Sequence, residues 1–155
     1  MPKELNSFLN LLGFKGKNDA FLLNPDVTIE NVTIKDFYYD SGNDKGYAFK
    51  LANNYNIGIV EQTIGRSPYV RNVTVLTKGS TTSASDPRGY DSADAGRGAL
   101  IDGSVAVQNS RSASCLFHAV TFITPGAIGL IAKSGSRVEW LNSFTYFAST
   151  GIKLE

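Results

Sequence analysis

The sequence is poor in the residues that most often build catalytic and metal sites. Its 155 residues include one cysteine, one histidine and one tryptophan. A lone cysteine excludes an intramolecular disulfide, and the apolar residues after Cys115 indicate a buried, unreactive thiol. One histidine and one cysteine are too few for a protein zinc site. We therefore predict no metal site and no cofactor.

A charge excess and a long apolar run are also absent. Fifteen lysines and arginines face 14 aspartates and glutamates, which leaves a net charge of +1 without any run of one sign. This balance gives no sign of nucleic-acid binding. No stretch of about 18 apolar residues occurs, and the N-terminus lacks the apolar core of a signal peptide. We expect a protein made in a cytosol that neither inserts into a membrane nor binds nucleic acid.

The first 24 residues differ from the rest of the chain in the spacing of their apolar residues. Apolar residues at positions 5, 8, 9 and 12 have helical spacing over two turns, before Gly13 and Gly16. So short a helix needs a surface to pack on. We predict a short N-terminal helix and connector over residues 1–24, and a candidate cap for one end of a β stack.

A motif of alternating, β-branched residues occurs four times after residue 25. It occupies residues 27–34, 69–75, 116–122 and 140–147. Aligned on Val32, Val73, Val120 and Phe144, the copies are 41, 47 and 24 residues apart. Glycines follow the later copies at a similar offset, so that Gly126 and Gly151 should be equivalent. A repeat of strand, glycine turn and strand without a helix is typical of a solenoid.

We therefore predict an all-β fold, a right-handed parallel β-helix (β-solenoid) over residues 25–155. Each coil would lie parallel to the previous one at about 4.8 Å. The spacing of 24 residues fits one coil, and the longer spacings fit either two coils or one coil with a long loop. Asn31, Asn72 and Asn142 share a repeat position, where asparagine tolerates the left-handed backbone of a sharp corner and can form an axial ladder. His118 takes that position in the third copy.

The longest irregular stretch, residues 79–98, is polar and rich in turn residues. Loops carry binding functions more often than scaffolds do, and aromatic plus charged tips suit sugar or protein contact. Arg88, Tyr90 and Asp91 are therefore the candidate ligand-binding residues. The aspartates of this loop match no EF-hand spacing and are interpreted as solvated charge.

No catalytic signature is present in the sequence, so we predict no catalytic residue. His118, the one histidine, has no nucleophile motif nearby. An alternative is polysaccharide hydrolysis, which needs two carboxylates about 5–9 Å apart. Asp102 and Glu139 would be the partners, with Trp140 beside Glu139 as a sugar platform. For Trp140 we favour a core or interface position.

Two runs of the sequence resemble a known group of proteins. Residues 115–126 (CLFHAVTFITPG) and 137–148 (RVEWLNSFTYFA) are similar to segments of large structural proteins of T4-like bacteriophages, cyanophages especially. The resemblance extends from about residue 25 to the end, and it rests on similarity along the sequence and not on a catalytic motif. It implies a β-helical tail-fibre or spike-like rod that supports host attachment.

The resemblance also implies partners and a location. These are other virion proteins, a homotrimer in the assembled phage, and a glycan of the host surface; the protein would reside in the virion after assembly in the host cytoplasm. The alternatives are a host-polysaccharide depolymerase, either a glycoside hydrolase or a lyase, and a carbohydrate-binding module. Because the chain stops within a strand-like segment at Glu155, we expect a piece of a longer protein or a partner that covers this end.

Overall fold

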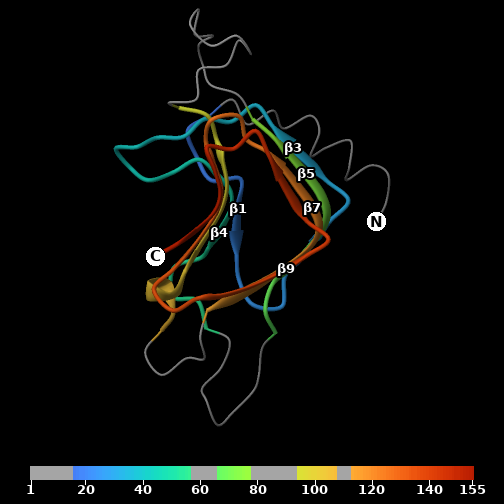
Figure 1. The fold of residues 1–155 in the computed structure, drawn as a ribbon. Coiled ribbons are helices and arrows are strands. Elements are labelled where there is room, and N and C mark those ends of the chain that lie inside the picture. The colour runs from blue at the N-terminus through green and yellow to red at the C-terminus, as the bar shows by residue number, and fades with distance from the viewer. Residues whose placement is uncertain (1–15, 57–65, 78–93, 108–112) are drawn as a thin grey trace, which may run out of the picture.

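The computed structural model describes residues 16–56, 66–77, 94–107 and 113–155, which form an all-β fold with two parallel sheets (Figure 1). Sheet A has the strand order β1-β4-β6-β8-β11, and sheet B has the order β10-β7-β5-β2, with β3 beside β5 and β9 beside β7. The sheet A strands are β1 (Phe21–Leu23), β4 (Tyr47–Leu51), β6 (Arg97–Asp102), β8 (Ile128–Lys133) and β11 (Thr150–Leu154). The sheet B strands are β2 (Thr28–Glu30), β3 (Thr33–Lys35), β5 (Tyr69–Leu76), β7 (Ser114–Ile123), β9 (Arg137–Leu141) and β10 (Phe144–Tyr146).

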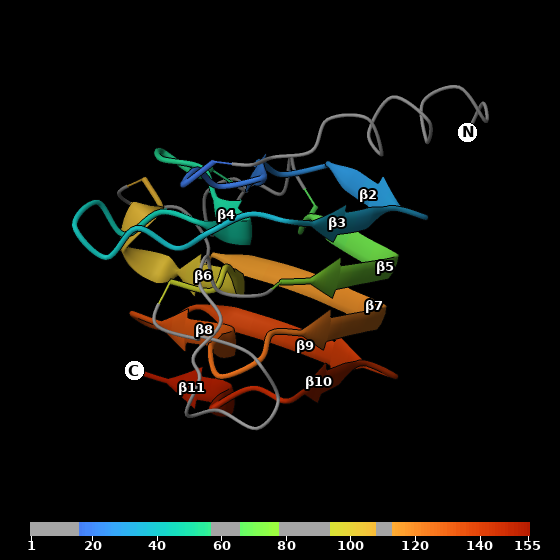
Figure 2. The same ribbon diagram turned by 90° about the horizontal axis from the view of Figure 1, so that it is seen from above.

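The chain visits the two sheets alternately, and we call each visit to sheet A followed by sheet B a pass. Every strand pair within the sheets is parallel, and each strand lies next to the corresponding strand of the previous pass. Figure 2 shows the passes stacked in sequence order, from β2 and β3 at one end to β10 and β11 at the other. The prediction of an all-β chain with parallel strands is therefore confirmed.

The strand register tests the predicted repeat alignment. Thr33 pairs with Thr74 and Val73 pairs with Val120, so the first three copies lie side by side as predicted. Their spacings of 41 and 47 residues therefore each correspond to one pass that carries excursions. The fourth copy was misaligned by one residue, because Phe144 pairs with Thr121 and faces outward. An alternating strand can be aligned in two registers, one residue apart, which bury opposite faces. When both faces carry apolar residues, the sequence alone does not say which face is buried.

The predicted asparagine corner is present, with one correction. Asn31, Asn72 and Asn142 have φ angles of 58°, 50° and 46°, in the left-handed region. The third pass uses Ala119, with φ 54°, and the assignment of His118 to this position was wrong. Asn72 Nδ2 donates to Asn31 Oδ1 at 2.6 Å, so the ladder exists between these two passes and stops where alanine offers no amide.

The core between the sheets is made of inward-facing columns of apolar side chains. Phe49 contacts Phe117 and Phe122, and both of these rings lie against Trp140 at centroid distances of 5.4–5.5 Å. The interpretation of Trp140 as a core residue is confirmed, since it packs partly buried against this cluster. Cys115 is buried in the same cluster, as predicted.

A column of glycines runs across three neighbouring strands of sheet A. Gly98, Gly129 and Gly151 lie beside one another on β6, β8 and β11. A Cβ atom on Gly98 would lie 2.0 Å from the carbonyl oxygen of Gly129, so the strands approach too closely for a side chain. The predicted equivalence of Gly126 with Gly151 was therefore wrong. Glycine after a strand and glycine within a strand look alike in sequence, and only the register separates them.

Two predicted segments lie wholly or mostly outside the described residues: the N-terminal helix around residues 5–12 and most of the loop at 79–98. Strand β1 pairs with β4, so sheet A begins at Phe21, inside the range assigned to the connector. Strand β6 begins at Arg97, just before the expected end of the loop. Among the described residues, no helix is long and apolar enough to span a membrane.

Candidate functional site

The structure places the alternative catalytic pair on different sheets. Asp102 ends β6 in sheet A, whereas Glu139 lies in β9 of sheet B. The Asp102 carboxylate accepts hydrogen bonds from the backbone N–H and hydroxyl of Ser104 at 2.9 and 2.7 Å, and Lys133 Nζ lies 3.2 Å from it. Its oxygens are thus occupied by neighbours within its own sheet and the following turn.

The ionisation of Asp102 also argues against a role as a catalytic acid. Burial alone would raise the pKa of this carboxyl, but the hydrogen bonds from Ser104 and the contact with Lys133 outweigh it and hold the pKa below its usual value. A general acid needs a raised pKa to carry a proton at neutral pH. The other sequence candidates, Arg88, Tyr90 and Asp91, lie outside the described residues.

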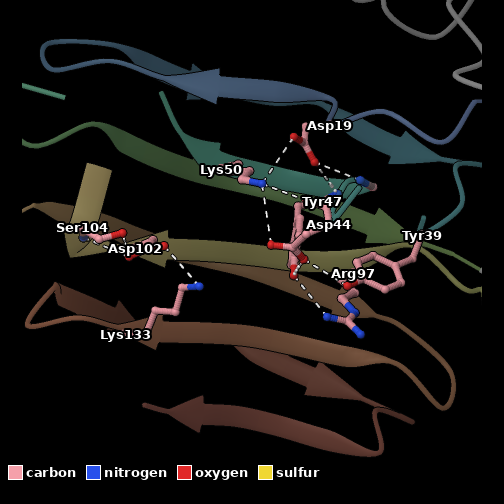
Figure 3. A network of polar contacts seen from close by, with 10 residues as sticks. Asp19, Tyr39, Asp44, Tyr47, Lys50, Arg97, Asp102, Ser104 and Lys133 are labelled. Atoms are coloured by element: carbon pink, nitrogen blue, oxygen red, sulfur yellow. Dashed lines mark hydrogen bonds and ion pairs between the residues drawn. The ribbon is translucent and has the colours of Figure 1, made fainter. Parts of the chain in front are cut away.

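A polar network covers the outer face of sheet A (Figure 3). Its centre is Asp44, whose Oδ1 atom accepts hydrogen bonds from the hydroxyls of Tyr39 at 3.0 Å and Tyr47 at 2.7 Å. Lys50 Nζ donates to the carbonyl oxygen of Asp44 at 2.8 Å. The guanidinium of Arg97 lies 3.5 Å from the centre of the Tyr39 ring, a cation–π contact. The segment around residues 39–46 is thereby fastened to sheet A.

The contacts of this network stabilise the fold. Asp19 accepts hydrogen bonds from the backbone N–H groups of Gly46 and Tyr47 at 2.9 and 3.0 Å, which fixes the entry into β4. Burial, and then the hydrogen bond to Asp44, raise the pKa of Tyr47, so this phenol stays protonated. The carboxylates of Asp19 and Asp44 lie 4.0 and 3.9 Å from Lys50 Nζ, and Arg97 donates to the Tyr47 hydroxyl at 3.1 Å. Among the described residues, no group of three or more metal-ligating side chains is assembled.

A cleft of about 300 Å³ opens on the outer face of sheet B, where β5, β7 and β9 begin. The register explains its composition, since Ser114 pairs with Arg137 and Leu116 pairs with Glu139 on the next pass. Tyr69 pairs with Leu116 on the other side, which places Ser67 beside Ser114. The lining residues are Arg66, Ser67, Ser114, Cys115, Leu116, Arg137 and Glu139.

The polar groups of the cleft converge from three passes. The hydroxyls of Ser67 and Ser114 share a hydrogen bond of 2.5 Å. Arg137 Nη2 donates to Glu139 Oε1 at 2.5 Å, in a pair whose two side chains are 72% and 48% exposed. The backbone of Arg66 is fixed by Asp26, which accepts from its N–H at 3.0 Å and donates to its carbonyl at 2.9 Å. Among the described residues, two arginines and one glutamate therefore line the cleft, and its hydrogen bond to Glu139 places the guanidinium of Arg137 there.

Cys115 lines the cleft, but its thiol is not reactive. Burial raises the pKa of its thiol far above the usual value, so the sulfur stays protonated and is a poor nucleophile. The cleft can thus bind a ligand through charge and hydrogen bonds, but the described residues that line it include no activated nucleophile. An apolar surface is present on the same wall, because Leu116 lines the cleft next to Cys115 and pairs in register with Glu139.

Sequence reasoning found one cleft residue, Glu139, and missed Arg66, Ser67, Ser114 and Arg137 as site residues. A signal was present in the sequence, because each of these residues lies two or three positions before a copy of the repeat. Stacking the segments that precede the repeats, and not only the repeats, would have gathered them. Comparisons of this chain with models of protein families, with curated proteins and with solved structures found no match.

Proposed function

We propose that sheets A and B are two sides of a right-handed parallel β-helix and that the chain is a rod-like structural part of a bacteriophage virion, of the tail-fibre or spike kind, supporting host attachment. The observation that carries this proposal is the in-register parallel stacking of both sheets through successive passes. Such stacking builds a shaft whose length grows with the number of passes.

The energetics of the stack support a stiff shaft. An inner strand such as β7 has parallel neighbours on both edges, so its backbone donors and acceptors are satisfied along the stacking direction. The core columns are continuous, and Phe49, Val120 and Ile101 are at most 1% exposed. A ladder with a dry, continuous core opens slowly to proteases and to denaturant.

The residues that carry the phage resemblance are those that build the core of sheet B. Phe117, Val120, Phe122 and Trp140 belong to or pack against the main cluster. In the proposed setting the protein is assembled in the host cytoplasm, joins other virion proteins and forms a homotrimer in the phage particle. The resemblance and the stacked sheets both favour a fibre or spike.

A carbohydrate-binding module is the second candidate, and the cleft on sheet B is the observation that favours it. A glycoside hydrolase would need a second carboxylate facing the ligand. Among the described residues, Glu139 is the one carboxylate that lines this cleft, and Asp102 is held within sheet A by Ser104 and Lys133. Binding is therefore favoured over polysaccharide cleavage.

Immunogold electron microscopy tests the virion assignment. Antibodies raised against the purified chain are expected to label a fibre or spike on virions of the phage that encodes it. Serum pre-absorbed with the purified chain is the control and should give no label. Absence of label from intact and detergent-opened virions, together with absence of its peptides from virion digests, would refute the proposal. Light scattering of the purified chain tests the homotrimer separately.

A further inference from the structure

We propose that the cleft at the start of β5, β7 and β9 binds the carboxylate of an acidic sugar within a surface glycan. This inference deepens the proposed role in host attachment and rests on it. Three features of the cleft lead to the ligand class: its charge, its paired hydroxyls and its apolar wall.

The charge of the cleft favours a ligand with one carboxylate. Among the residues that the structure describes, Arg66 and Arg137 line it, against one carboxylate, Glu139. Guanidinium presents several donors in a planar fork that matches a carboxylate with two parallel hydrogen bonds. The Arg137–Glu139 pair is exposed, and exposed pairs contribute little stability. Arg137 can therefore turn toward an incoming carboxylate at small cost, and its five N–H donors are enough to keep Glu139 as well.

The paired serines favour a hydroxylated ligand. Ser67 and Ser114 share one hydrogen bond, at 2.5 Å, so the pair retains one O–H donor and several lone pairs for a ligand. Sugar hydroxyls both donate and accept, which is the chemistry that such a pair offers. Glu139 adds hydrogen-bond acceptors on the neighbouring strand β9, where it pairs in register with Leu116.

The apolar wall distinguishes a sugar from a bare anion or a nucleic acid. Leu116 lines the cleft, and its partly exposed side chain gives a non-polar surface for the C–H face of a sugar ring. A polyanion would need a longer basic track. The next outward arginine on this face, Arg71, is instead paired with Glu30. The cleft volume of about 300 Å³ is at the small end of ligand sites, as expected for a short stretch of glycan.

Isothermal titration of the purified chain with acidic oligosaccharides tests the inference. The probes are oligogalacturonate, a hyaluronan fragment and sialyllactose, each with its carboxyl-reduced counterpart, and inorganic phosphate. We expect at least one acidic probe to bind, with its reduced counterpart about tenfold or more weaker, because a charge-assisted hydrogen bond is lost. Phosphate should bind much more weakly than that probe, because it makes no use of the apolar wall.

Three matched variants locate the site. Arg66→Gln and Arg137→Gln should each weaken binding of the acidic probe about tenfold to a hundredfold. Arg71→Gln is the control, because Arg71 is an exposed arginine of the same sheet whose contacts, Glu30 and the Tyr69 ring, do not line the cleft. This variant should bind the acidic probe as tightly as the wild type. Circular dichroism melts confirm that each variant is folded.

Several outcomes would overturn the inference. These are no binding of any acidic probe, equal binding of reduced and acidic probes, phosphate as tight as the sugar, or equal losses in Arg71→Gln and the cleft variants. Because the titration uses the purified chain and no virion, it fails or succeeds independently of the immunogold test. Virion labelling without acidic-sugar binding would leave the fibre assignment standing and remove this ligand.

Discussion

The glycine column gives the sharpest prediction about the fold, through the substitution Gly98→Ala. The added Cβ would lie 2.0 Å from the carbonyl oxygen of Gly129, whereas real Cβ contacts essentially never fall below 3.0 Å. Strands β6 and β8 would therefore have to separate locally by about 1 Å, because the obstacle is backbone and cannot rotate away. The ring of Phe122, 2.5 Å from the same Cβ, would have to move as well.

The expected cost follows from these two displacements. Overpacking a close-packed core costs roughly 1–3 kcal/mol, and each weakened ladder hydrogen bond adds about 1 kcal/mol. We expect Gly98→Ala to lower the free energy of unfolding by about 3 kcal/mol. For a chain of this length, that corresponds to a fall in Tm of about 6–12 °C.

Urea and thermal unfolding followed by circular dichroism measure this loss. Gly42→Ala is the matched control, since its Cβ would meet the nearest atom, Asp40 Oδ1, at an ordinary 3.4 Å. The control should stay within about 0.5 kcal/mol of the wild type. If Gly98→Ala melted within about 2 °C of the wild type, the close approach of β6 and β8 would be wrong.

Three further predictions concern single side chains. Asn72 has a φ of 50°, so Asn72→Val should lower the free energy of unfolding in urea by about 1–2 kcal/mol, whereas Asn72→Gly should cost less; equal losses would contradict the corner. Cys115 should react with Ellman's reagent only as fast as the chain unfolds, because burial raises the pKa of its thiol; rapid labelling in buffer would contradict its position. The pKa of Asp102 is lower folded than unfolded, so its contribution is complete above the unfolded value of 3.8 and disappears as pH falls through the folded value. Asp102→Asn should therefore cost about 1 kcal/mol in urea unfolding at about pH 7 and nothing near pH 2, and a loss equal at both pH values would exclude the ionised contact with Lys133.

The repeat predicted much of the sheet B architecture because its signal is local. Val32, Val73 and Val120 align in the structure as they do in the sequence, and Asn31 and Asn72 form the expected rung. The predicted alignment of the fourth copy was wrong because its outward residues are as apolar as its inward ones. Phe144 and Tyr146 are 54% and 47% exposed on the outer face, and this reverses the usual cue for burial.

The candidate site was much less accessible to sequence reasoning than the fold. Asp102 and Glu139 were paired on the assumption that adjacent coils bring distant carboxylates together, yet the chain turns a corner between them. The cleft joins Ser67, Ser114 and Arg137 instead, residues that are 47 and 23 positions apart along the chain. Their proximity depends on the register of three passes and on the length of the excursions between them.

The sequence by itself determined the secondary-structure class, the recurring strand and the three asparagines of its left-handed corner, because all three follow from side-chain alternation and local backbone preference. Only the tertiary structure decided which face of the last copy is buried, which glycines lie in one column and which polar side chains share a cleft. These depend on how strands far apart in sequence come into register, and that register is set by close packing and backbone hydrogen bonds that no single segment contains.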